Sequence, residues 1–105
     1  MPKAPSDDRR ISEMKNLGPA CELDLNRAGI TTAQQLKELG PVAAFIQMLS
    51  ARKELGMTTK CCNAAYLYAL YGAIHDIDWR SLPSAKKSEF KELTREMRES
   101  GQFTS

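Results

Sequence analysis

The sequence has little of what metal binding and catalysis require. It contains one histidine, His75, and three cysteines, and neither a Cys-x-x-Cys nor a His-x-x-x-His spacing occurs in its 105 residues. A structural zinc site usually takes four such ligands, so we expect no metal. A Gly-x-x-x-x-Gly-Lys phosphate loop and a carboxylate cluster suited to magnesium are also missing. We therefore expect no cofactor, no small-molecule substrate and no enzyme activity.

Long apolar runs and a dense basic block are absent too. No window approaches the ~18 consecutive apolar residues of a membrane span, and the polar start of the chain lacks the apolar region of a signal peptide. We expect a cytoplasmic protein without membrane contact. The 15 basic and 13 acidic side chains give a net charge of +2 and are interspersed. That balance argues against generic nucleic-acid binding, although a few cations beside backbone donors suffice for weak contact.

The three cysteines cannot all pair within one chain. Cys61 and Cys62 are adjacent, beside Lys60 and near an expected helix start, a setting that can lower a thiol pKa and make the sulfur reactive. A thiol redox sensor is therefore an alternative function. Cys62 also shares an apolar stripe with Tyr66, which favours the simpler interpretation of these cysteines, Cys21 included, as reduced core residues.

Glycine, proline and capping hydroxyls divide the rest of the chain into short helices. No stretch shows the period-two alternation of a half-buried strand. We predict an all-α domain of five to six short helices over residues 7–100, with a flexible tail at 1–6 and a short polar tail at 101–105. The expected helices span residues 6–15, 19–28, 33–39, 41–54, 61–74 and 84–100.

The apolar residues of these segments predict how the helices pack. The segment 61–74 is apolar nearly all round, as expected of a central helix surrounded by the others. We expect the connector after it to fold back onto the core through Trp79 and Leu82. In the third and fourth helices we expect the inward-facing residues to be Leu36, Leu39, Val42, Phe45, Ile46 and Leu49, with Leu23 packed on the flank of the second.

Two Leu-Gly-Pro turns, at residues 17–19 and 39–41, suggest a binding function. Glycine supplies a left-handed conformation at a helix end, and proline suits the first position of the next helix. Such a turn exposes backbone amides at the positive end of a helix, where a phosphate can bind. The candidate nucleic-acid contacts at the first turn are Arg9, Arg10, Lys15, Gly18 and Ala20. The alternative is that both turns are only efficient connections between helices.

Several ordered motifs resemble one family. They are Asn16-Leu17-Gly18-Pro19, Ala28-Gly29-Ile30-Thr31-Thr32, Gln35-Leu36, Leu39-Gly40, Phe45, Asn63, the run from Leu67 to Ile74, and Trp79-Arg80-Ser81-Leu82-Pro83. Over roughly residues 11–90 the chain resembles the C-terminal domain of the TfoX (Sxy) family of bacterial competence regulators. The resemblance implies a bundle similar to SAM-like and helix-hairpin-helix domains, a role in regulating DNA-uptake genes, and no enzyme activity. Family members generally add an N-terminal domain, for which this chain has no room.

The leading interpretation is a small regulatory binding module whose partner is DNA or a transcription-related protein. In the DNA version, the first turn and its cations hold phosphates. In the protein version, an exposed aromatic patch, with Tyr68 and Tyr71 as candidates, or the outer edge of the last helix docks on another chain or on a second copy. The sequence leaves the oligomeric state open.

Overall fold

A computed structural model describes residues 7–103, which form an all-α domain with no multi-residue strand among them. The expected tail at residues 1–6 lies outside the described residues. None of the helices formed by residues 7–103 has the length and hydropathy of a bilayer-crossing segment. The elements are η1 (Ile11–Glu13), α1 (Pro19–Arg27), α2 (Ala33–Leu39), α3 (Pro41–Glu54), α4 (Ala64–His75), η2 (Trp79–Ser81) and α5 (Ser84–Glu99), where η denotes a 3-10 helix.

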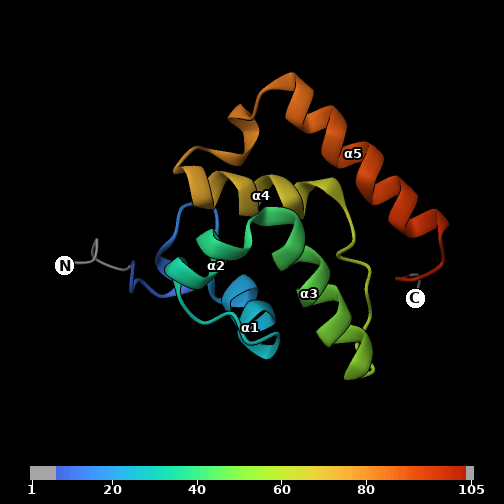
Figure 1. Ribbon diagram of the computed structural model, residues 1–105, viewed down its shortest axis with the longest axis horizontal. Helices are drawn as coiled ribbons and strands as arrows, with labels where there is room; N and C mark the ends of the chain where they lie inside the picture. Colours follow the sequence, from blue (N-terminus) through green and yellow to red (C-terminus); the bar gives the residue numbers. More distant parts are fainter. Residues whose placement is uncertain (1–6, 104–105) are drawn as a thin grey trace.

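Helix α4 lies at the centre of the fold, as its apolar sequence predicts. In Figure 1 it crosses the middle of the molecule, with α1, α2 and α3 on one side and α5 on the other. It packs against α2, α3, α5 and η2. Leu67 and Leu70 are fully buried on it. Helices α3 and α5 therefore contact α4 from opposite sides.

The expected first helix over residues 6–15 is wrong. Residues 7–10 are extended, and only Ile11–Glu13 make a single 3-10 turn. The carbonyl oxygens of Asp7 and Arg9 accept hydrogen bonds from the amides of Gln34 and Ala33, each at 2.9 Å. These amides belong to the first turn of α2 and have no acceptor within that helix. Acids such as Asp7 and Asp8 favour the start of a helix. Here the hydrogen bonds that cap α2 hold residues 7–10 extended instead.

The start of α4 is also later than the sequence suggests. The cap is Asn63, whose side-chain oxygen accepts from the Tyr66 amide at 3.1 Å, so Cys61 and Cys62 precede the helix. Thr59, another residue with a capping hydroxyl just before the helix, is buried, and its hydroxyl donates to the Phe103 carbonyl. Asparagine is among the strongest capping residues, which explains why it takes the position.

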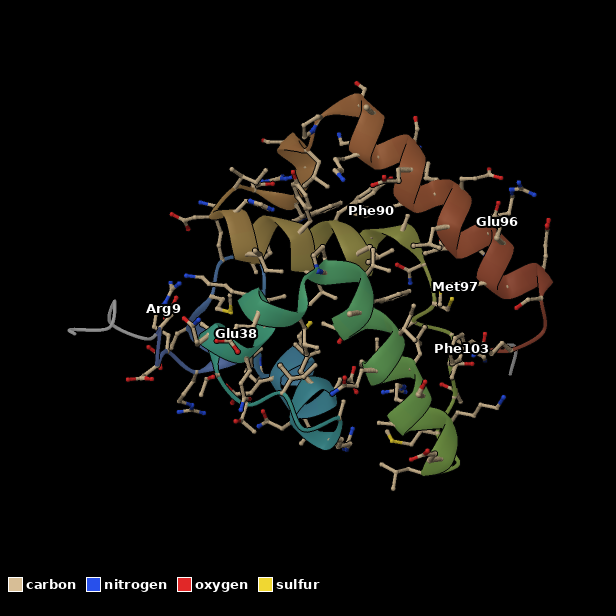
Figure 2. The ribbon with its side chains drawn as sticks, viewed as in Figure 1. Arg9, Glu38, Phe90, Glu96, Met97 and Phe103 are labelled. Carbon is tan, nitrogen blue, oxygen red and sulfur yellow. The ribbon has the colours of Figure 1, made fainter. Side chains whose placement is uncertain are left out.

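The described part of the C-terminal segment packs on the domain, in contrast to the polar tail expected over residues 101–105. Phe103 is 4% exposed and belongs to the core. The Lys53 ammonium donates to the Gln102 carbonyl at 2.9 Å, and Arg98 of α5 donates to the Cys62 carbonyl at 3.1 Å. In Figure 2 Phe103 lies beside the α3–α4 linker, on the same side as Met97. The segment therefore covers the linker.

Four apolar residues expected to be inward are exposed. Leu39 and Ile46 are each 38% exposed, Trp79 is 40% exposed and Leu23 is 52% exposed. The remaining core predictions for α2, α3 and the connector are confirmed for Leu36, Phe45, Leu49 and Leu82, all of which are buried.

Candidate functional site

The first Leu-Gly-Pro turn does not have the expected glycine geometry. Gly18 has φ −125° and ψ −169°, which is ordinary extended backbone, and it precedes the proline that opens α1. The left-handed residue is Asn16, with φ 71°. Only in the second turn is the glycine left-handed, since Gly40 has φ 85°. The two turns share a sequence but not a conformation.

The side chain of Asn16 anchors the first turn to the end of α4. Its amide nitrogen donates to the Ile77 carbonyl at 2.9 Å, and its oxygen accepts from the Trp79 amide at 3.2 Å. Gly72 allows this approach, because a Cβ at that position would lie 2.5 Å from the Ile77 oxygen and closer still to the Asn16 amide nitrogen. The first turn thus has an evident structural role in joining the two halves of the fold.

The arginines proposed to hold phosphate are paired with acids of this chain. Arg9 contacts Asp7 at 2.7 Å, and Lys37 contacts the same carboxylate at 2.6 Å. The Arg9 and Lys37 cations hold the pKa of Asp7 well below its usual range. Arg10 contacts Glu22 at 2.9 Å, where the Ser12 amide and then Arg10 lower the pKa of Glu22 to about 2. A phosphate would have to compete with these carboxylates for both guanidinium groups.

The remaining candidates near the first turn contribute little positive charge. Lys15 is exposed, and Gly18 and Ala20 lie at the start of α1, where first-turn amides lack acceptors within the helix. However, the carboxylate of Glu22 lies in the first turn of the same helix. Acids near a helix N-terminus already complement its dipole and repel an anion. Among the described residues, Lys15 is thus the one candidate cation that makes no ion pair, while Arg9 and Arg10 are both paired.

Of the two tyrosines proposed for protein contact, Tyr68 is buried and Tyr71 is half-buried. The Tyr68 hydroxyl donates to the Lys87 carbonyl at 3.1 Å, and its ring packs 6.3 Å from that of Phe90. Tyr68 therefore joins α4 to α5. The expectation that it belongs to an exposed patch is wrong, because its side chain is buried. The Tyr71 ring packs 4.2 Å from the His75 ring and reaches the surface between α4 and α5.

A wide groove opens beside Tyr71. It has a volume of about 890 Å³ and runs from the α2–α3 turn across the end of α4 to α5. Tyr71, His75, Lys86 and Glu89 are the titratable groups among its lining residues. The Lys86 ammonium lies 3.0 Å from Glu89 and 5.7 Å from the centre of the Tyr71 ring. The larger apolar side chains of the groove are Leu39, Val42, Ile46, Tyr71, Phe90 and Leu93.

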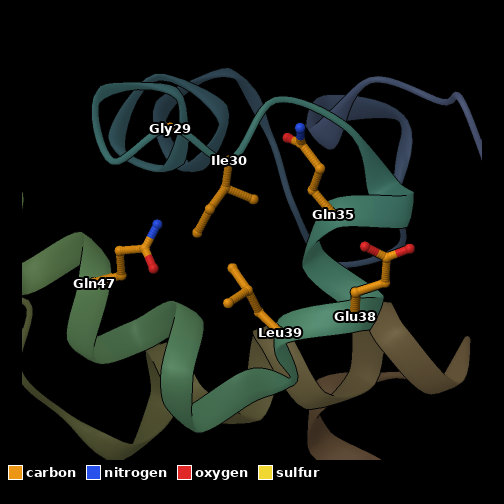
Figure 3. A pocket seen from close by; sticks show the side chains of 6 residues that line it. All are labelled: Gly29, Ile30, Gln35, Glu38, Leu39 and Gln47. Atoms are coloured by element: carbon orange, nitrogen blue, oxygen red, sulfur yellow. The ribbon is translucent and has the colours of Figure 1, made fainter.

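A smaller hollow adjoins the groove on the other side of Leu39. It has a volume of about 300 Å³ and is lined by Gly29, Ile30, Gln35, Glu38, Leu39 and Gln47, as Figure 3 shows. Its amide groups already have partners: Gln35 accepts from the Thr31 amide at 2.7 Å, and Gln47 donates to the Ala28 carbonyl at 2.7 Å. The hollow therefore offers less to a polar ligand than its composition suggests, and Leu39 links it to the larger groove.

Sequence reasoning missed most of this groove. Leu39 and Ile46 fit the apolar periodicity of their helices and were expected to be buried. Their exposure depends on how far α5 lies from α3, which no local pattern records. The signal that was available is the width of the apolar stripe on α3, formed by Val42, Phe45, Ile46 and Leu49. This apolar surface is wider than a single neighbouring helix can bury.

Residues 7–103 show no metal-binding cluster, and the surroundings of Cys61 and Cys62 disfavour the thiolate. Among residues 7–103 no three His, Cys, Asp or Glu side chains gather where a metal ion would fit, and no buried polar side-chain atom is left without a partner. Burial raises the pKa of both Cys61 and Cys62, and Cys62 is 2% exposed. The thiolate that a redox sensor needs is thus disfavoured at both sites, and Cys62 is confirmed as a core residue.

The TfoX C-terminal domain family model matches residues 7–94 of the sequence. The chain belongs to the TfoX C-terminal domain family. This membership indicates a regulatory type of domain. The match confirms the resemblance seen in the residues and includes the first turn, both hollows and most of α5. It ends before the C-terminal segment that covers the α3–α4 linker.

Two solved structures share this fold. One is the triclinic form of an uncharacterized protein from Listeria monocytogenes, which is 34% identical and has a TM-score of 0.72 over 85% of this chain and 93% of that chain. The other, a tetragonal form of a protein of unknown function from the same organism, is 34% identical with a TM-score of 0.67 over 83% and 98%. No curated protein matches the sequence.

Proposed function

We propose that this chain is a non-enzymatic regulatory domain that assembles with another polypeptide through the apolar groove between α3, α4 and α5. The observation that carries this proposal is the groove itself, about 890 Å³ in volume, with Leu39 and Ile46 each 38% exposed at its edge. Exposed apolar surface of this kind, rimmed by charged residues, is typical of an interaction site. An amphipathic helix laid with its apolar face in the groove is the best-matched occupant.

The charges of the groove support a polypeptide in preference to nucleic acid. Lys86 is paired with Glu89, so the rim has no excess of cations. At the first turn, the alternative nucleic-acid site, Arg9 and Arg10 are paired with Asp7 and Glu22. Nucleic-acid affinity comes mainly from cations that replace the counterions of phosphates. In the setting of a competence regulator, the domain would act by joining protein components of the transcription machinery.

An NMR titration with two probes tests this proposal. The first probe is an amphipathic helical peptide with leucines on one face and equal numbers of lysine and glutamate on the other; the second is a short duplex DNA at low salt. We expect the peptide to shift the amide signals of Ile46, Tyr71 and Leu93, and the DNA to leave the spectrum unchanged. Ile46→Glu should abolish the peptide shifts, because it places a charge in the apolar contact.

Leu23→Glu is the matched control, since Leu23 is also an exposed apolar residue of a helix but lies outside the groove. It should leave peptide binding unchanged. The proposal fails if the peptide shifts no groove signal. DNA-induced shifts at Lys15, Gly18 and Ala20 that fade with salt, and that disappear with Arg9→Ala and Lys15→Ala, would establish the nucleic-acid function instead.

A further inference from the structure

The charges of α5 are arranged in the order that a single helix disfavours. Residues 84–91 contain three lysines and one glutamate, whereas residues 92–99 contain three glutamates and two arginines. The positive end of a helix dipole is its N-terminus, so isolated helices are stabilised by acids there and by cations at the C-terminus. Helix α5 has no acid in its first turn, and its last turn carries Glu96 and Glu99 as well as Arg98.

A neighbouring helix that runs in the opposite direction would correct this arrangement. It would set acidic side chains beside the basic half of α5 and basic side chains beside the acidic half, and the two helix dipoles would also oppose each other. A second copy of α5 has the required charge order. Pairing α5 with its own copy around a two-fold axis makes the complementarity hold at both ends, as an isologous contact requires.

One flank of α5 has the spacing for such a contact. Lys86, Glu89, Leu93 and Glu96 follow one another at intervals of three, four and three residues, which places them on the same side of the helix. The first three line the groove. Among residues 7–103 the Glu96 carboxylate has no ion-pair partner, and Figure 2 shows Glu96 on the side of α5 away from α4.

The register of the pair follows from these positions. Lys86 and Glu96 are ten residues apart, about 15 Å along the helix. When two copies of α5 lie antiparallel with their centres at the level of Lys91, Lys86 of each copy is opposite Glu96 of the other. Leu93 of each copy then lies at the level of Glu89 of the other, close to the apolar floor formed by Tyr71 and Phe90.

We propose that the occupant of the groove is a second copy of this chain, bound through antiparallel α5 helices around a two-fold axis. This inference rests on the proposed function, because it names the partner of the same groove. The contact shields Leu39 and Ile46 in both copies, and the pairs between Lys86 and Glu96 fix its direction.

Sedimentation velocity with charge-swapped variants tests the proposal. The wild-type chain is expected to associate into dimers as its concentration rises. Lys86→Glu and Glu96→Lys should each weaken the dimer about tenfold, because each makes two like-charge pairs across the two-fold axis. An equal mixture of the two variants should recover the wild-type affinity, since every cross-copy pair in the mixed dimer is again of opposite charge.

Lys60→Glu is the matched control: it reverses an exposed lysine that belongs neither to α5 nor to the groove. It should dimerise as the wild type does, and circular dichroism should show the same helix content for all variants. The inference is overturned if the wild-type chain stays monomeric, or if the mixed variants do not recover. If the chain is a monomer but its groove still binds the amphipathic peptide, the self-association is wrong and the proposed function stands. If the groove binds neither, both are wrong.

Discussion

Asn16 makes long-range hydrogen bonds that no local sequence pattern around it indicates. It adopts a left-handed conformation that asparagine tolerates better than most residues, and its side chain bonds both Ile77 and Trp79. Gly72 faces it from the middle of α4, where glycine would otherwise weaken a helix. The two residues are 56 positions apart. The absence of a side chain at Gly72 leaves the space that the Asn16 side chain occupies.

We expect Gly72→Ala to lower the free energy of unfolding by about 1–3 kcal/mol, because the added Cβ meets Asn16 and the Ile77 carbonyl. In an Asn16→Gly background, which removes one of the two obstacles, the same substitution should cost less. Urea unfolding of the four chains in this double-mutant cycle gives both values. If Gly72→Ala instead stabilises the protein, as alanine does in an unobstructed helix, the proposed contact is wrong.

At the scale of elements, the two Leu-Gly-Pro turns show that one tripeptide can serve two geometries. Between α2 and α3 the turn is a true helix-to-helix corner, in which Gly40 ends one helix and precedes the next with φ 85°. Before α1 the chain arrives from a 3-10 turn, and the left-handed position has moved two residues back, to Asn16. Gly18 therefore has no conformational need to be glycine.

Substitution by alanine separates the two turns. Gly40→Ala should destabilise the domain by about 1–2 kcal/mol, because the positive φ at this position is strained for any residue with a Cβ. Gly18→Ala should change stability by no more than about 0.5 kcal/mol, since its backbone is extended and open space surrounds the position. Thermal unfolding of the two variants measures the difference, and equal effects would contradict the assignment of different conformations.

At the scale of the whole molecule, ionic contacts join the N-terminal segment to the helices. The Arg10 guanidinium and the Ser12 amide both bind Glu22 of α1, while Asp7 joins this segment to Lys37 of α2. The pKa of Glu22 is lowered to about 2 in the folded chain. A carboxylate whose pKa is lower in the folded state stabilises it above the unfolded pKa and loses that effect as the pH falls.

We therefore expect the free energy of unfolding to be steady near neutral pH and to fall between about pH 4.5, the unfolded value of glutamate, and pH 2. Glu22→Gln should flatten this decline, because glutamine does not titrate. Glu54→Gln, at an exposed glutamate ending α3, should leave the slope as in the wild type. Denaturant titrations across this pH range, at one protein concentration, provide the test. An unchanged slope in Glu22→Gln would show that this carboxylate is not the linked group.

Where caps and periodicity are local, the sequence determined the structure well. Thr32 caps α2 and proline opens α1 and α3, so the bounds of α2 and α3 were predicted to the residue. The apolar run of α4 and its central place were evident for the same reason. These features depend on hydrogen bonds and side chains within a few residues of one another, which the order of residues alone specifies.

Tertiary structure decided the rest. It turned the expected first helix into an extended cap for α2, paired Arg9 and Arg10 with acids, buried Tyr68 and Phe103, and left Leu39 and Ile46 exposed. Apart from the Arg9–Asp7 pair, whose members are two residues apart, each of these outcomes depends on partners far away in the chain. A local pattern holds no record of the distance between α3 and α5. The candidate groove exists only because two helices rest on opposite sides of a third.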